Sequence, residues 1–132
     1  NNVIILLTEY EASQSAGLIG LNYYSSDDLL ASNFFKRKRV ILESQQTIAV
    51  YHYASNSIKE VSTSRISKFP IINESFMAGF CTGLASKQNY DLCAMWGICS
   101  YMQGSKHKII KKHKILEDLK KFKWNVRKPT VF

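Results

Sequence analysis

The chain has 132 residues, of which 45% are hydrophobic and 21% are charged, so it is long enough for one packed domain and too short for a two-domain enzyme. Its apolar runs are much shorter than a membrane span, and it shows neither an export signal nor a disulfide framework. These features argue against membrane-spanning and disulfide-rich secreted proteins, and we expect a cytoplasmic protein that makes no membrane contact.

The net charge of +8 is confined to the end of the chain. Residues 106–132 hold ten of the 18 Lys and Arg residues but only two of the ten acids, Glu117 and Asp118, whereas residues 1–105 are neutral. A neutral body followed by a cationic tail is typical of a protein that binds a polyanion through that tail.

The first predicted elements are a strand and a helix. The aliphatic run 3–7 is typical of a strand that is covered on both faces, as in a parallel sheet. Residues 25–27 can cap a helix, because Ser and Asp side chains accept hydrogen bonds from the free N–H groups at a helix start. The cations at 36–39 suit the negative end of a helix dipole, and they also match a nuclear-import signal. The apolar residues at helical spacing are Leu29, Leu30, Phe34 and Phe35.

Two more strands and two helices follow. Residues 40–42 and 47–53 predict strands, and the second has two mostly apolar faces. Asn73 is placed to cap a helix with one apolar face, formed by Phe76, Met77, Phe80, Cys81 and Leu84. Another helix is predicted over 90–102, ending at Gly104, with an inner side of Leu92, Cys93, Trp96, Cys99 and Ser100. This order predicts an α/β fold with three buried cysteine thiols.

Residues 75–84 carry the most specific pattern in the chain. Their sequence, Ser-Phe-Met-Ala-Gly-Phe-Cys-Thr-Gly-Leu, closely resembles the helix after the Gly-Ala-Gly-Asp signature of ribokinase-like (PfkB-type) kinases, most of all adenosine kinases. Weaker resemblances occur in the expected order. Residues 8–12 resemble the family's Asn-Glu-Thr-Glu-Ala segment, 40–51 its strand, Thr-x-Gly turn and strand, and 91–102 its helix beside the adenine pocket.

The resemblance spans about residues 3 to 104 and excludes the basic tail. It implies a partial ribokinase-like, Rossmann-like layered sheet with helices, which corresponds to the C-terminal part of such a kinase in degenerate form. We therefore expect a ribokinase-like domain over residues 1–104 and a basic amphipathic tail over residues 105–132.

The positions that carry the chemistry of this family have changed. In the family, the Gly-Ala-Gly-Asp turn forms an anion hole for the transferred phosphate, and its Asp is the catalytic base. Here the four positions are Ile71, Ile72, Asn73 and Glu74. The two isoleucines are β-branched and do not readily adopt the backbone conformation of a glycine turn. Glu74 carries its carboxylate one methylene further out than the family's Asp. We therefore expect the Glu74 carboxylate to interact with the positive end of the helix dipole rather than to act as a base. Glu11 matches the family's Mg²⁺-associated Glu, although Thr8 replaces the Asn of that segment.

These changes imply a catalytically inactive, kinase-like scaffold without a cofactor. The alternative is a fragment of an ATP-dependent sugar or nucleoside kinase, completed by further sequence. Only that alternative implies ATP and Mg²⁺.

The tail combines cations with aromatic residues, which suits phosphate contacts and base stacking. It predicts binding to structured RNA, above all to a ribosome, with ribosomal proteins as further partners. The residues expected to contact nucleic acid are Lys106, Lys108, Lys111, Lys112, Lys114, Lys120, Lys121, Lys123, Trp124, Arg127 and Lys128.

The alternative for the tail is an amphipathic helix with solvated lysines. Its apolar side would pack on the body through Ile115, Leu116, Leu119 and Phe122. The two readings are compatible, because one face can pack while the other binds. Three histidines without Cys or acidic partners at ligand spacing predict no metal site.

Overall fold

The computed structural model describes residues 3–18, 20, 25–32, 35, 38–63, 70–106 and 111–130. The chain divides into a sheet unit, Asn1–Thr63 with Trp124–Phe132, and a helical unit, Ser64–Lys123. The helical unit is therefore an insertion between two segments of the sheet unit. Residues 124–132 of the basic tail belong to the sheet unit, and its preceding residues belong to the helical unit.

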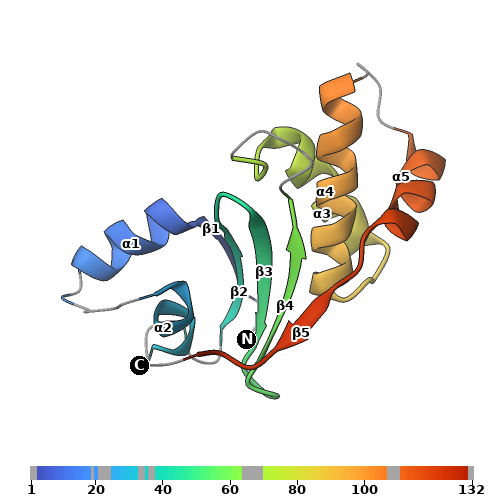
Figure 1. The fold of residues 1–132 in the computed structure, drawn as a ribbon. Helices are drawn as coiled ribbons and strands as arrows, with labels where there is room; N and C mark the ends of the chain where they lie inside the picture. The colour runs from blue at the N-terminus through green and yellow to red at the C-terminus, as the bar shows by residue number, and fades with distance from the viewer. Residues whose placement is uncertain are drawn as a thin grey trace. The chain divides into compact units, whose positions relative to one another are not determined.

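The sheet unit is built on a mixed sheet of five strands in the order β1-β2-β3-β4-β5 (Figure 1). Strand β1 is parallel to β2, and the other neighbouring pairs are antiparallel. The strands are β1 (Ile4–Thr8), β2 (Arg39–Glu43), β3 (Thr47–His52), β4 (Ser57–Ser62) and β5 (Asn125–Arg127). The α/β fold class predicted from the sequence is confirmed.

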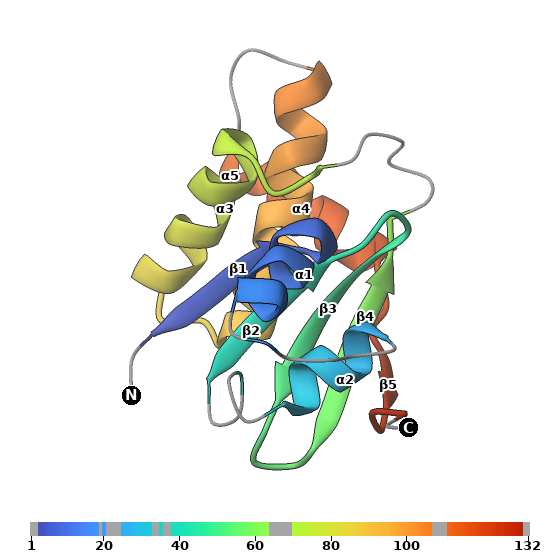
Figure 2. The same cartoon turned by 90° about the vertical axis from the view of Figure 1, so that its left-hand side faces the viewer.

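Two helices, α1 (Glu9–Leu18) and α2 (Ser26–Ala31), lie on one face of this sheet (Figure 2). Alternate residues of a strand point to the same face, and on this face those of β1, β2 and β3 are largely apolar. The resulting core consists of Ala12, Ala16, Leu29, Leu30, Phe35, Val40, Leu42, Ala49, Tyr51 and Ile58, with Ile5 and Leu7 packed against it.

The helical unit consists of α3 (Glu74–Ala85), α4 (Tyr90–Lys106), α5 (Lys112–Asp118) and the 3-10 helix η1 (Leu119–Lys121). Helices α3 and α4 approach closely because Gly79 faces α4. A Cβ atom on Gly79 would lie 2.4 Å from both the Trp96 carbonyl oxygen and the Ser100 Cβ. A separate cluster packs α5 and η1 on α4 through Trp96, Cys99, Ile115, Leu92, Leu119 and Phe122.

The predicted strands at 3–7, 40–42 and 47–53 agree with β1, β2 and β3 to within one residue at each end. Residues Ile48 to Tyr51 of β3 are all buried, as its two apolar faces indicated. Strand β4 and helix α1 were not predicted. Strand β4 alternates charged and apolar residues only weakly, and α1 has almost no apolar stripe, so neither offered a clear periodicity.

Two predicted helix ends are wrong. The helix capped by Ser25 ends at Ala31, because the Ser32 side chain and backbone N–H both donate to the Leu29 carbonyl oxygen, at 2.7 and 3.2 Å. Residues Phe34, Lys36 and Arg37 lie outside the described part of the chain. Helix α4 continues through Gly104 to Lys106, because a glycine costs a helix only about 1 kcal/mol.

Two expected burials are also corrected. Cys81 is exposed, whereas Cys93 and Cys99 are buried. On α5, Ile115 is buried but Leu116 is exposed, so the apolar side of the tail is narrower than expected. Among the described residues, no helix is long and apolar enough to cross a membrane.

Candidate functional site

The start of α3 is the place where the family resemblance puts a phosphate site. Asn73 is its N-cap, and its Oδ1 accepts a hydrogen bond from the Phe76 N–H at 3.0 Å. Its carbonyl oxygen accepts from the Met77 N–H at 2.9 Å. The predicted N-cap is confirmed. One of the free donors of the helix start is thereby occupied by the chain's own amide side chain.

The residues beside this cap differ in their surroundings. Ile71 is buried and Ile72 is half-buried, whereas Glu74 is exposed in the first turn of α3. The Glu74 carboxylate has no hydrogen-bond or ion-pair partner within the described residues, and neither do the backbone N–H groups of Glu74 and Ser75. A negative charge at this position is favoured by the helix dipole. An open carboxylate and two open N–H groups therefore meet at the start of α3.

The backbone at this start is anchored to α4. The Ser100 hydroxyl donates to the Ser75 carbonyl oxygen at 2.6 Å, and Ser100 is fully buried. A Cβ on Gly97 would lie 2.7 Å from the Phe76 ring, so the ring packs directly on the α4 backbone. Phe76 also stacks on Phe80, with ring centroids 6.1 Å apart. These contacts fix the first turn of α3 without the glycines of the family's signature.

Glu11 has a structural role at the start of α1. Its Oε1 accepts from the Thr8 N–H at 2.9 Å, and the Thr8 hydroxyl oxygen accepts from the Glu11 N–H at 3.2 Å. This reciprocal pair is a capping box, which satisfies two donors of the helix start. The Thr-x-x-Glu spacing of residues 8–11 is the sequence signature of this motif.

The basic tail is divided between the two units. Lys111, Lys114, Lys120, Lys121 and Lys123 belong to the helical unit and are exposed. Lys108 and the side chains of Lys106 and Lys112 lie outside the described part. Trp124, Arg127 and Lys128 belong to the sheet unit. The predicted nucleic-acid-binding residues therefore form two separate sets.

Both acids of the tail neutralise a lysine on the same helical stretch. Lys114 Nζ lies 3.3 Å from Glu117 Oε2, and Lys121 Nζ lies 3.0 Å from Asp118 Oδ1. Asp118 raises the pKa of Lys121 above its ordinary value. Within the described residues, the side chains of Lys111, Lys120 and Lys123 make no ion pair. These three are the open cations of the helical unit.

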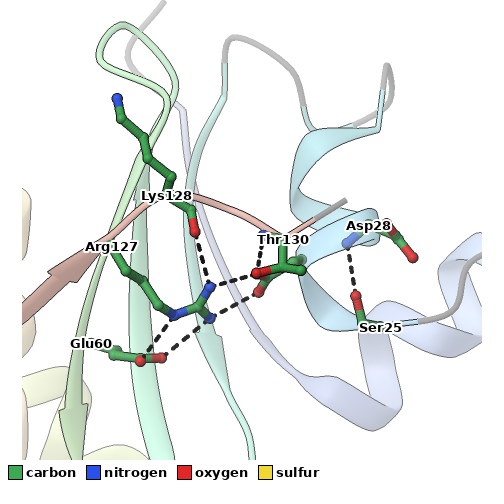
Figure 3. Close-up of polar contacts among 7 residues, drawn as sticks. Ser25, Asp28, Glu60, Arg127, Lys128 and Thr130 are labelled. Carbon is green, nitrogen blue, oxygen red and sulfur yellow. Dashed lines mark hydrogen bonds and ion pairs between the residues drawn. The ribbon is translucent and has the colours of Figure 1, made fainter. Parts of the chain in front are cut away.

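Arg127 is held by two carboxylates of its own unit (Figure 3). Its Nη2 donates to Asp27 Oδ1 at 2.9 Å, its Nη1 to Asp27 Oδ2 at 2.5 Å and its Nε to Glu60 Oε1 at 3.0 Å. The guanidinium holds the pKa of Asp27 below its ordinary range, and both carboxylates raise the pKa of Arg127. Asp27 was expected only as a possible cap and Glu60 was not singled out.

The other sheet-unit residues of the predicted set differ from Arg127. Lys128 is exposed and donates from Nζ to the Ser55 carbonyl oxygen at 2.7 Å. Trp124 is half-buried. The described residues contain no group of three His, Cys, Asp or Glu side chains that could hold a metal ion.

Comparison with known proteins identifies the fold. The chain matches no protein-family model and no curated protein. Among solved structures, it is similar to the crystal structure of "a putative sugar kinase from Clostridium perfringens", with a TM-score of 0.67 and 20% sequence identity. The match covers 97% of this chain but 43% of that protein, so the chain spans less than half of its length. The five-stranded mixed sheet with its helices thus resembles part of the fold of that protein.

Proposed function

We propose that the chain is part of an ATP-dependent sugar or nucleoside kinase of the ribokinase type. The observation that carries this proposal is the fold match over 97% of the chain. The resemblances at 8–12, 40–51, 75–84 and 91–102 support it, because they follow the order of the family's own segments.

The start of α3 fits the phosphate-side chemistry in two respects. Its two open N–H groups, on Glu74 and Ser75, lie at a helix N-terminus and can donate hydrogen bonds to phosphate oxygens. The exposed carboxylate of Glu74 is a base for an acceptor hydroxyl, at the position where the family has Asp. Both groups lie on a turn that Ser100 anchors.

Two other features disfavour rapid transfer. Asn73 occupies the Phe76 N–H, and the loss of one such donor lowers kcat on the order of 100- to 1000-fold in a related kind of anion hole. One carboxylate oxygen of Glu11 already accepts the Thr8 N–H in the α1 capping box, so a Mg²⁺ ion would compete with that hydrogen bond for the carboxylate. A slow reaction that depends on Glu74 is the expectation.

The test is transfer of labelled phosphate from Mg-ATP to ribose or adenosine by the whole chain. We expect a slow rate above the protein-free control, a return to that control in Glu74→Gln, and an increase of about tenfold or more in Asn73→Gly. Glu9→Gln is the matched control, because Glu9 also occupies the first turn of a helix. A wild-type rate equal to the protein-free control would reject transfer by this chain alone.

The second candidate is a catalytically inactive scaffold that binds structured RNA, with a ribosome and its proteins as the proposed partner. The open cations Lys111, Lys120 and Lys123 favour it, because unpaired exposed lysines are available for phosphate contacts. Arg127 is a weaker candidate contact than the sequence suggested, since RNA would have to displace two carboxylates from it.

Fluorescence anisotropy with a labelled single-stranded RNA tests this candidate as a function of salt. Lys120→Ala and Lys123→Ala should each make the negative slope of log K against log salt concentration less steep by about 0.7. Lys114→Ala is the matched control, since Glu117 pairs with that lysine, and it should change the slope less. Equal slopes in the wild type and in both open-lysine variants would count against RNA contacts by this surface.

A further inference from the structure

Residues 125–130 are attached to the sheet unit with little help from apolar burial. Strand β5 has three residues at the edge of the sheet, and Asn125 and Val126 are exposed. Val126, its only aliphatic residue, is 58% exposed. A segment that buries so little apolar surface gains little from the hydrophobic effect. Its attachment must therefore be largely polar.

Arg127 is the centre of that polar attachment. Its guanidinium connects β5 to α2 through Asp27 and to β4 through Glu60, and it also donates to the Lys128 carbonyl oxygen at 3.3 Å. The Thr130 N–H donates to Asp27 Oδ2 at 2.8 Å, so the same carboxylate binds the segment twice (Figure 3). Charge-assisted, two-pronged contacts of this kind are the strong class of hydrogen bonds.

We propose that residues 125–130 form a releasable strap, fastened by Arg127, that covers the edge of β4. This inference is independent of the proposed function. Because β5 is the outermost strand, its release makes β4 the new edge of the sheet. An uncovered edge strand is a template for pairing with a second copy of the chain, so the strap controls whether that edge is available.

The backbone pattern identifies the amides that report on release. The Thr63 N–H, just beyond β4, donates to the Gln46 carbonyl oxygen on the β3 side at 2.7 Å. Successive N–H groups of a strand point to opposite neighbours, so the N–H groups of Ile58 and Glu60 point to β5. Ile58 lies opposite Arg127 and Glu60 lies opposite Asn125. Opening of the strap exposes these two amides and leaves the β2–β3 ladder intact.

Amide hydrogen exchange of the whole chain, resolved by residue, tests the strap. Arg127→Ala should accelerate exchange at Ile58 and Glu60 on the order of 10- to 100-fold, as expected for the loss of charged hydrogen bonds, with little change in β2 and β3. Arg127→Lys keeps the positive charge but cannot donate to a carboxylate through two nitrogens. Its exchange rates should therefore lie between those of the wild type and Arg127→Ala. Lys123→Ala is the matched control, because it removes an exposed lysine just outside the strap, and it should change these rates less than about threefold.

Two results would overturn the strap. Unchanged exchange at Ile58 and Glu60 in Arg127→Ala would show that the guanidinium does not fasten β5. Equal acceleration in β2 and β3 would show that the strap does not open separately from the sheet. If Arg127→Ala does not fold, the same two criteria apply to Asp27→Asn. Light scattering should also detect a larger dimer fraction in the variant than in the wild type at equal concentration. An unchanged dimer fraction would refute the claim that the strap keeps β4 from pairing with a second copy.

Discussion

The sheet unit and the helical unit are stabilised over very different distances along the chain. In the helical unit, α3 packs on α4 through glycines, and the buried bond between Ser75 and Ser100 spans 25 residues. In the sheet unit, Arg127 binds a carboxylate 100 residues earlier. Close helix packing thus rests on residues near one another in the sequence, whereas the sheet unit is completed by polar contacts between Asp27 and Arg127, which are far apart in the sequence.

The largest expected effect is on the helical unit. Gly79→Ala places a Cβ 2.4 Å from the Trp96 carbonyl oxygen, and overpacking of this kind should lower the free energy of unfolding by about 2 to 3 kcal/mol. In α1 of the sheet unit, a Cβ on Gly17 meets nothing within 4 Å. Gly17→Ala should therefore raise the free energy of unfolding by up to about 1 kcal/mol. Urea unfolding followed by circular dichroism measures both. Opposite signs of the change in unfolding free energy would support the difference between the two units. An unchanged unfolding free energy in Gly79→Ala would contradict the close packing of α3 on α4.

A smaller effect is expected from the two helix caps, one in each unit. Asn73→Ala and Thr8→Ala should each lower the free energy of unfolding by about 1 kcal/mol, because each removes a side-chain acceptor from a helix start. Glu11→Gln keeps an acceptor for the Thr8 N–H and should cost less than Glu11→Ala. The same urea titrations report these changes. A loss in Glu11→Gln as large as in Glu11→Ala would mean that the charge, rather than the capping box, matters.

The smallest effect is a pH dependence confined to the sheet unit. The Arg127 guanidinium lowers the pKa of Asp27 below 3.8, so the stabilisation by Asp27 is complete above that pH and is lost as the pH falls through the folded-state value. The difference in unfolding free energy between wild type and Asp27→Asn should therefore shrink below about pH 4. Urea titrations at pH 6 and pH 3 measure it. A constant difference at both pH values would exclude a role for the Asp27 charge.

The parts of the fold that were predicted from the sequence are those with local periodicity. The aliphatic run of β1 and the apolar face of α3 each repeat within a few residues, so their place and type were predicted. The end of α2 depends on one serine that competes for the Leu29 carbonyl oxygen. Periodicity carries no information about such a single contact.

The candidate site shows the same limit. The Asn73 cap was predicted, because an N-cap acts within four residues. The cluster of Asp27, Glu60 and Arg127 was missed, because nothing in the local sequence of any of the three residues indicates the other two. Glu11 was matched by resemblance to the family's Mg²⁺-associated position, and its Thr-x-x-Glu spacing is also the signature of the capping box that the structure shows.

The separation of Asp27 and Arg127 along the sequence also sets an order of events during synthesis. The 100 residues between them take about 5 to 20 s to translate at ordinary elongation rates. During that interval α2 carries an acid whose partner does not yet exist, and β4 has no outer neighbour. The nascent sheet therefore keeps an open edge at β4 while the whole helical unit is made, and residues 125–130 close that edge afterwards.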